Sequence, residues 1–204
     1  MKVGEPVAFK ALGVDLSGPA NHADTCMAWR NLDGRVEWRC DCSDQDILTW
    51  QRDQSLPVSA FIDAPLSYQD GGGYRHCDAV LRAYLNAQGL NRLGVMAPTM
   101  TKMVYLTLRG ISLSTRLRQQ GAEVFETHPG ASMLLSGMEK DWVYDIKRCS
   151  QSRSSILALW TNQGNRFVES PTNDHQLMAI QCLLTAERWL TAGAYYWRCE
   201  SWLV

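Results

Sequence analysis

The sequence has no apolar segment long enough to cross a membrane. Nothing in its 204 residues approaches the roughly 20 consecutive apolar residues that a spanning helix needs. The opening residues MKVGEPVAFK also lack the apolar core of a secretory signal peptide. We therefore expect a cytoplasmic protein with no membrane partner.

The sequence also lacks the short motifs that mark several enzyme classes. No Walker A sequence occurs, and GVDLSG at residues 13–18 does not match the GxGxxG fingerprint of dinucleotide-binding folds. Nothing resembles the nucleophile elbow of a Ser-His-Asp hydrolase. These absences argue against a P-loop NTPase, a dinucleotide-dependent oxidoreductase and a serine hydrolase.

Cysteine pairs with metal-site or redox spacing are missing as well. The seven cysteines are scattered, no CxxC pair occurs, and CDC at residues 40–42 is not a zinc-finger spacing. We expect all of them to be small buried apolar residues of a reducing compartment.

Acidic residues are absent from two long stretches, although the formal net charge of the chain is only −1. Residues 79–122 and 146–168 contain no Asp or Glu. The basic residues in these stretches are Arg82, Arg92, Lys102, Arg109, Arg116, Arg118, Lys147, Arg148, Arg153 and Arg166. They form either solvated helix faces or a cationic rim for a polyanion such as nucleic acid.

Apolar patterning predicts a strand-rich start followed by alternating strands and helices. Asp33-Gly34 is a strong hairpin signal, and Ser43 is a good N-cap for the first helix. We predict strands at 8–16, 24–32, 35–42, 58–67 and 122–129, and helices at 43–54, within 68–89, and at 99–121 and 173–193. This order predicts an α/β fold, a mixed sheet flanked by helices, as a single domain spanning residues 1–204.

Three of the strand-like runs end in an acidic residue just before a turn. Asp15 closes ALGVD, Asp63 closes AFID, and Glu126 closes AEVFE. Each acid alone could cap a turn, but ligands gather at the carboxyl ends of parallel strands. Carboxylates that converge there repel one another unless a cation neutralises them. The pattern therefore predicts a site for a hard divalent cation, with all three acids in one cleft.

Five segments together resemble a known family. GVDLSG, FIDAPLS, RHCDAVLR, EVFETHPGAS and NDHQLMAIQCLLTA occur in the order and spacing of domain-of-unknown-function family 429, described as predicted nucleases of the ribonuclease-H-like fold. The resemblance runs from about residue 10 to 195. It implies a five-stranded mixed sheet whose first three strands are antiparallel, and an acidic cluster that binds two divalent metal ions, Mg²⁺ or Mn²⁺.

The resemblance also implies a set of catalytic metal ligands. Asp15 matches the bridging carboxylate, and Asp63 and Glu126 match the second and third acids. At the fourth acidic position, on the last helix, this chain has Met178. A thioether is a poor Mg²⁺ ligand, so either Asp174, one helical turn earlier, takes this role or the second metal site is weakened.

Further residues are candidates for contact with substrate. Ser17 begins a turn whose backbone N–H groups suit phosphate, and His128 lies two residues after Glu126. Arg75 is spaced for either a structural ion pair or a substrate contact. The remaining candidates are Arg116, Arg118 and Lys147, whereas His22 and His175 are assigned to surface turns.

The leading hypothesis is a metal-dependent nuclease that hydrolyses phosphodiester bonds of DNA or RNA by a two-metal mechanism. The alternative is a non-catalytic nucleic-acid- or nucleotide-binding module with a degenerate acidic site, as Met178 suggests. An actin-like phosphotransferase is disfavoured because 204 residues leave little room for its second domain. The sequence leaves the oligomeric state open, including a homodimer.

Overall fold

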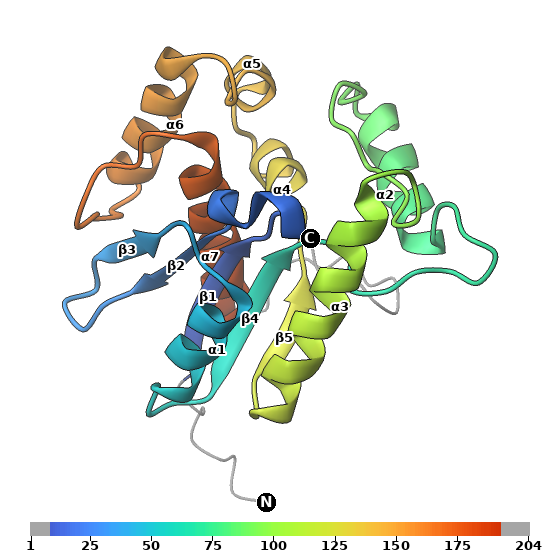
Figure 1. Ribbon diagram of the computed structural model, residues 1–204. Helices are drawn as coiled ribbons and strands as arrows, with labels where there is room; N and C mark the ends of the chain where they lie inside the picture. The colour runs from blue at the N-terminus through green and yellow to red at the C-terminus, as the bar shows by residue number, and fades with distance from the viewer. Residues whose placement is uncertain (1–8, 193–204) are drawn as a thin grey trace, which may run out of the picture.

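Five strands form one mixed sheet in the order β3-β2-β1-β4-β5 (Figure 1). The computed structural model describes residues 9–192 of the chain. The strands are β1 (Lys10–Asp15), β2 (Cys26–Arg30), β3 (Val36–Arg39), β4 (Val58–Asp63) and β5 (Glu123–Glu126). The first three are antiparallel neighbours, whereas β1, β4 and β5 run parallel. The predicted α/β class and its mixed sheet are confirmed, and the topology is consistent with the ribonuclease-H-like fold.

Helices connect the parallel strands and complete the chain. A short 3-10 helix, η1 (Pro19–Asp24), joins β1 to β2. The α-helices are α1 (Asp44–Arg52), α2 (His76–Ala87), α3 (Met103–Gln119), α4 (Pro129–Leu135), α5 (Lys140–Tyr144), α6 (Ser150–Asn162) and α7 (Asp174–Ala192). The Ser43 side chain caps α1 by accepting from the Asp46 backbone N–H, as predicted. The predicted elements run past the observed bounds by up to four residues at an end, and α2 fills only the second half of the segment 68–89.

The two faces of the sheet carry separate apolar layers. Leu12 and Val14 of β1 face the layer that α1 and α3 complete, and Figure 1 shows these two helices in front of the sheet. Ala11 of β1 and Phe61 of β4 belong to the other layer, which α7 covers. This alternation follows from the two-residue period of a strand. It also decides which face each residue at a strand end occupies.

Helix α7 packs so closely against β1 that the backbones of the two elements are in contact at Gly13. A Cβ added at Gly13 would lie 2.2 Å from the Ala179 carbonyl oxygen and 2.2 Å from the Leu183 nitrogen. Only glycine leaves room for this approach. Further along the same face, the Trp189 ring packs on Phe125 and Phe61, with centroids 4.6 and 6.0 Å away.

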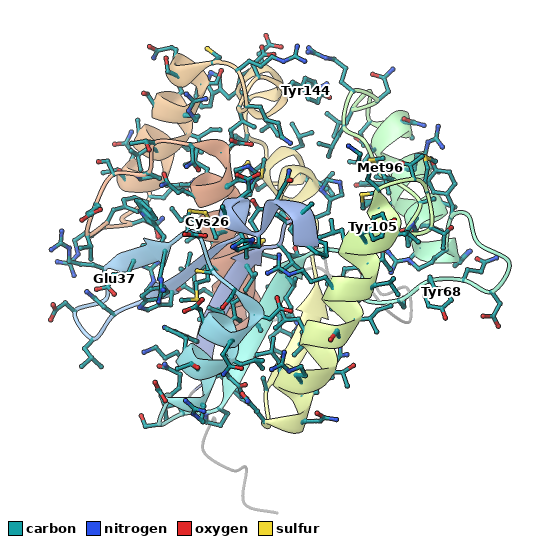
Figure 2. The ribbon with its side chains drawn as sticks, in the orientation of Figure 1. Cys26, Glu37, Tyr68, Met96, Tyr105 and Tyr144 are labelled. Atoms are coloured by element: carbon teal, nitrogen blue, oxygen red, sulfur yellow. A yellow bond between two sulfur atoms is a disulfide. The ribbon has the colours of Figure 1, made fainter. Side chains whose placement is uncertain are left out.

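The cysteine prediction is wrong for Cys26 and Cys40, which the structure joins in a disulfide (Figure 2), and for Cys149, which is only partly buried; Cys199 lies outside the described residues. Met27 pairs with Arg39 in the β2–β3 register, so Cys26 and Cys40 are the next residues facing each other. A search for CxxC spacing misses cysteines that a hairpin places opposite one another. Among residues 9–192, no helix is long and apolar enough to span a membrane.

Candidate active site

Asp15 and Asp63 lie side by side at the carboxyl ends of adjacent parallel strands. They are partners in the β1–β4 register, so both side chains lie on the α7 face. Burial raises the pKa of Asp15. The pKa of Asp63 is raised well above its usual value by burial, then by the charges of Asp15 and Glu126. We call Asp15 and Asp63 the acidic pair.

His175, on the first turn of α7, contacts the acidic pair directly. Its Nδ1 lies 2.7 Å from Asp15 Oδ2, and this hydrogen bond raises the pKa of the imidazole. The sequence assigned His175 to a surface turn, and this assignment is wrong. The two residues are 160 positions apart, so no local pattern reveals the contact.

Two predicted residues lie close enough to the pair to influence its charge. Asp174 begins α7, and its charge raises the pKa of both Asp15 and His175. Lys147, in the exposed turn between α5 and α6, lowers the pKa of Asp15 and Asp63. Met178 is partly buried and packs against the apolar layer under α7. The pair therefore has an acidic side and a cationic side.

Glu126 leaves β5 on the other face of the sheet from the acidic pair, so two of the three predicted carboxylates lie side by side, and the charge of the third adds to burial in raising the pKa of Asp63. It is in register with Ile62, one residue before Asp63, and so faces the opposite side of the sheet. Arg75 holds both of its carboxylate oxygens at 2.8 Å, and the Leu66 N–H donates to Oε2 at 2.9 Å. Burial raises the pKa of Glu126 to about 7, against the lowering effect of the Arg75 guanidinium.

Arg75 itself is 5% exposed and forms a buried ion-pair triad with two carboxylates. Besides Glu126, it donates to Asp78 from Nε at 2.9 Å and from Nη2 at 2.7 Å. Asp78 in turn accepts from the Arg75 backbone N–H, which closes the first turn of α2. This triad ties α2 to the end of β5, so Arg75 has a structural role whether or not it contacts substrate.

Ser17 and His128 both form hydrogen bonds with nearby residues of the protein. The Ser17 N–H donates to Thr25 Oγ1 at 3.2 Å, and its carbonyl accepts from Arg109 at 2.6 Å. His128 caps α4, with Nδ1 accepting from the Ala131 N–H and Nε2 lying 3.2 Å from the Gly94 carbonyl. Burial lowers the pKa of His128. These contacts position the loops beyond β1 and β5.

Arg116 and Arg118 lie at the other end of the sheet from the acidic pair. They belong to the last turn of α3, which leads into the amino end of β5. Arg116 reaches Gln45 on α1 at 3.3 Å, and Arg118 donates to the Val124 carbonyl at 2.8 Å. A substrate at the acidic pair would have to extend along α3 to reach them.

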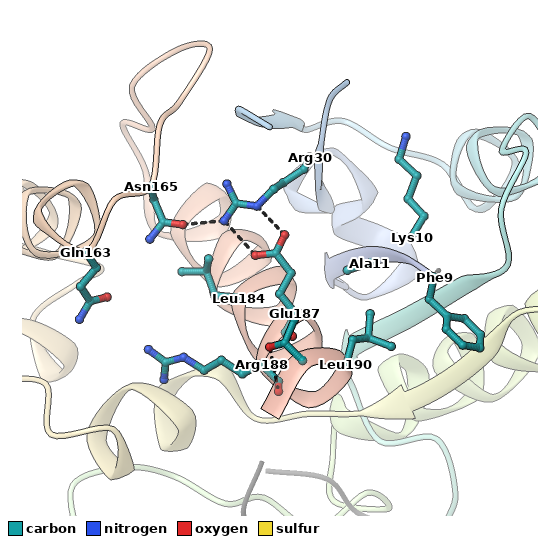
Figure 3. A pocket seen from close by; sticks show the side chains of 11 residues that line it. Phe9, Lys10, Ala11, Arg30, Gln163, Asn165, Leu184, Glu187, Arg188 and Leu190 are labelled. Carbon is teal, nitrogen blue, oxygen red and sulfur yellow. Dashed lines mark hydrogen bonds and ion pairs between the residues drawn. The ribbon is translucent and has the colours of Figure 1, made fainter. Parts of the chain in front are cut away.

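A cavity of about 760 Å³ also lies away from the acidic pair (Figure 3). Its lining includes Lys10, the first residue of β1, whereas Asp15 is the last. Inside it Arg30 holds Glu187 at 2.6 and 2.9 Å and Asn165 at 2.7 Å. The charge of the Arg30 guanidinium is thus already neutralised by Glu187.

The donor set of the acidic pair suits one hard cation. Mg²⁺ typically takes one or two protein carboxylates and completes its shell with water and substrate phosphate. Between residues 9 and 192, no group of three or more His, Cys, Asp or Glu side chains is arranged to hold a metal ion. Two adjacent carboxylates, one buried and one partly buried, with raised pKa values fit a cation that is only partly coordinated by protein.

The sequence comparison places the chain in one family. The model of the family described as "Protein of unknown function (DUF429)" matches residues 13–199. No curated protein and no solved structure matches the chain. The protein therefore belongs to the DUF429 family, and its activity must be argued from its own residues.

Proposed function

We propose that this DUF429 protein is a divalent-cation-dependent nuclease whose cation, Mg²⁺ or Mn²⁺, binds at the acidic pair. One observation carries the proposal. Asp15, which is buried, and Asp63, which is partly buried, lie side by side in register, and the pKa of each is raised. Two carboxylates held this way are costly to ionise alone, and a cation relieves that cost.

The bound cation would lower the pKa of a water and offset charge on a phosphate. The chain supplies the rest. His175 orients Asp15 and can hold a proton at Nδ1, since its pKa is raised. Lys147 supplies positive charge beside the pair for a phosphate group, and Asp174 is proposed as an outer ligand.

Glu126 enters the proposal as a positioning residue. With Arg75 on both oxygens, it accepts the Leu66 N–H and so fixes the loop that follows Asp63. The loop and Asp63 are thereby held relative to β5. Nucleic acid remains the proposed substrate because Lys147, whose charge acts on the acidic pair, belongs to the acid-free stretch 146–168, which also carries Arg148, Arg153 and Arg166.

Calorimetric titration with Mg²⁺ and Mn²⁺ tests the proposal. Wild type should bind a cation, and Asp15→Asn should lose most of the binding heat. Asp53→Asn, which changes an exposed carboxylate after α1, is the matched control and should bind as wild type does. Equal binding by wild type and Asp15→Asn would place the cation elsewhere. Cleavage of labelled single- and double-stranded DNA and RNA, with cation or with EDTA, then tests hydrolysis.

The second candidate is a nucleic-acid-binding module without hydrolytic activity. Two points favour it: Arg75 binds both carboxylate oxygens of Glu126, and Met178 stands where the family resemblance implies a fourth acid. If Asp174 serves as the substitute ligand, Asp174→Ala abolishes cation-dependent cleavage. If the position is simply lost, wild type cleaves poorly and Met178→Asp improves cleavage only when the cation is present. Binding of nucleic acid with no cleavage by wild type or Met178→Asp would favour the module.

A further inference from the structure

Thr127 occupies the position beside the acidic pair that the sequence assigned to Glu126. Its backbone N–H donates to the Ile62 carbonyl at 2.9 Å, a bond that belongs to the last β4–β5 pair, Glu126 with Ile62. Thr127 follows Glu126 directly, as Asp63 follows Ile62. Thr127 is therefore the neighbour of Asp63. In-register neighbours share a face of the sheet, so Thr127 lies on the α7 face with both carboxylates.

The Thr127 hydroxyl is buried without a hydrogen-bond partner. The residue is 1% exposed, and within the part of the chain that the structure describes its Oγ1 has no partner. Buried hydroxyls are nearly always paired, because an unpaired one costs stability. Thr107 shows the usual arrangement: it is 2% exposed, and its Oγ1 donates to the Pro98 carbonyl at 2.8 Å.

The order of residues across the sheet indicates what this hydroxyl contacts. Asp15 and Asp63 end β1 and β4, and Thr127 directly follows β5; these three adjacent strands are spaced about 4.8 Å apart. A cation between the two carboxylates leaves the hydroxyl as the next polar group in the row. An anionic oxygen attached to that cation would lie within its range, and a hydroxyl is a donor that such an oxygen accepts.

We propose that the Thr127 hydroxyl donates a hydrogen bond to a non-bridging phosphate oxygen of the bound substrate. The inference rests on the proposed function, because it takes the acidic pair as the phosphate site. It assigns Thr127 to substrate binding and explains the unpaired hydroxyl as a group whose partner arrives with the ligand.

The test measures inorganic phosphate binding and thermal stability for the same variants. Thr127→Val removes the hydroxyl but keeps the shape, and should weaken phosphate binding about tenfold or more while leaving Mg²⁺ affinity unchanged. Its melting temperature should stay the same or rise, because no protein hydrogen bond is lost. Thr107→Val is the matched control, and its melting temperature should fall. Thr127→Ser keeps the donor and should bind phosphate nearly as wild type does.

Several outcomes would overturn the inference. Phosphate binding that Thr127→Val leaves unchanged, or a fall in melting temperature like that of Thr107→Val, would show that the hydroxyl serves the fold. The inference also fails if wild type binds no phosphate with or without Mg²⁺, or if Thr127→Ser loses as much affinity as Thr127→Val. Absence of Mg²⁺ binding in wild type refutes the proposed nuclease separately. Phosphate binding that Thr127→Val weakens would still support the role of Thr127.

Discussion

Replacing Asp63 by Asn should make the cation-free protein less sensitive to rising pH. Burial and the charges of Asp15 and Glu126 raise the pKa of Asp63 well above 3.8. Between 3.8 and the raised value, the unfolded chain has lost this proton while the folded chain keeps it. The protonated carboxyl therefore contributes fully to the free energy of unfolding below that window. This contribution is lost as the pH rises through the window.

The size of the effect follows from proton linkage. One proton held by the folded state alone changes the free energy of unfolding by up to about 1.4 kcal/mol per pH unit. For a chain of this size, about 1 kcal/mol corresponds to roughly 2–4 °C in melting temperature. Wild type should therefore lose about 3–6 °C per pH unit within the window through this pair. Because Asp15 and Asp63 interact, the proton belongs to the pair, and one replacement removes the effect.

Calorimetric melting in EDTA, between about pH 4.5 and 7.5, measures how steeply the melting temperature falls with pH, which is the slope that proton linkage predicts. The difference between wild type and Asp63→Asn should grow with pH, with the variant the more stable at the upper end. Asp53→Asn should follow wild type throughout, which separates the acidic pair from the other carboxylates. Parallel curves for wild type and Asp63→Asn would refute the reasoning. Adding Mg²⁺ at the upper pH should stabilise wild type and not Asp63→Asn.

Three further predictions concern residues around the acidic pair. Arg75→Met leaves two buried carboxylates unpaired and should lower the free energy of unfolding by about 3–5 kcal/mol, measured by urea denaturation; a loss below about 1 kcal/mol would contradict the buried triad. Gly13→Ala forces α7 away from β1 and should cost at least about 1–3 kcal/mol, with a lower melting temperature; an unchanged value would be inconsistent with the close approach. Neutralising Arg116 and Arg118 together should flatten the salt dependence of oligonucleotide binding and leave Mg²⁺ affinity unchanged. An unchanged salt slope would assign them to a solvated helix face.

The positions of Asp15 and Asp63 were predictable because each ends an apolar run that is visible in the sequence. The sequence did not by itself pair their strands, because β2, β3 and α1 lie between them in the chain. The face that Glu126 occupies was not predictable in the same way. Face depends on register with Ile62, and a shift of one residue exchanges the two faces. Glu126 does end its strand, as predicted, but it faces the opposite side of the sheet from Asp15 and Asp63.

The partners of these acids are long-range contacts that local patterns do not encode. His175 meets Asp15 because α7 lies along β1, and the sequence shows only a histidine near a helix start. The ion pair of Arg75 with Asp78 is visible from its three-residue spacing, whereas the contact with Glu126, 51 residues away, is not. Conversely, the acid-free stretch 79–122 spreads along the whole of α3, so its basic residues do not form one rim around the site.

The close contact of Gly13 with α7 also has a consequence for how the chain folds. It joins the first strand to a helix that follows every other described element, more than 150 residues later. During synthesis the sheet residues 10–126 emerge before α7, so Phe61 and Phe125 must wait for their covering helix. Contacts of such sequence separation form slowly, and a sheet with an open apolar face is prone to aggregate. We therefore expect slow folding, in which the acidic pair gains His175 only at the last docking step.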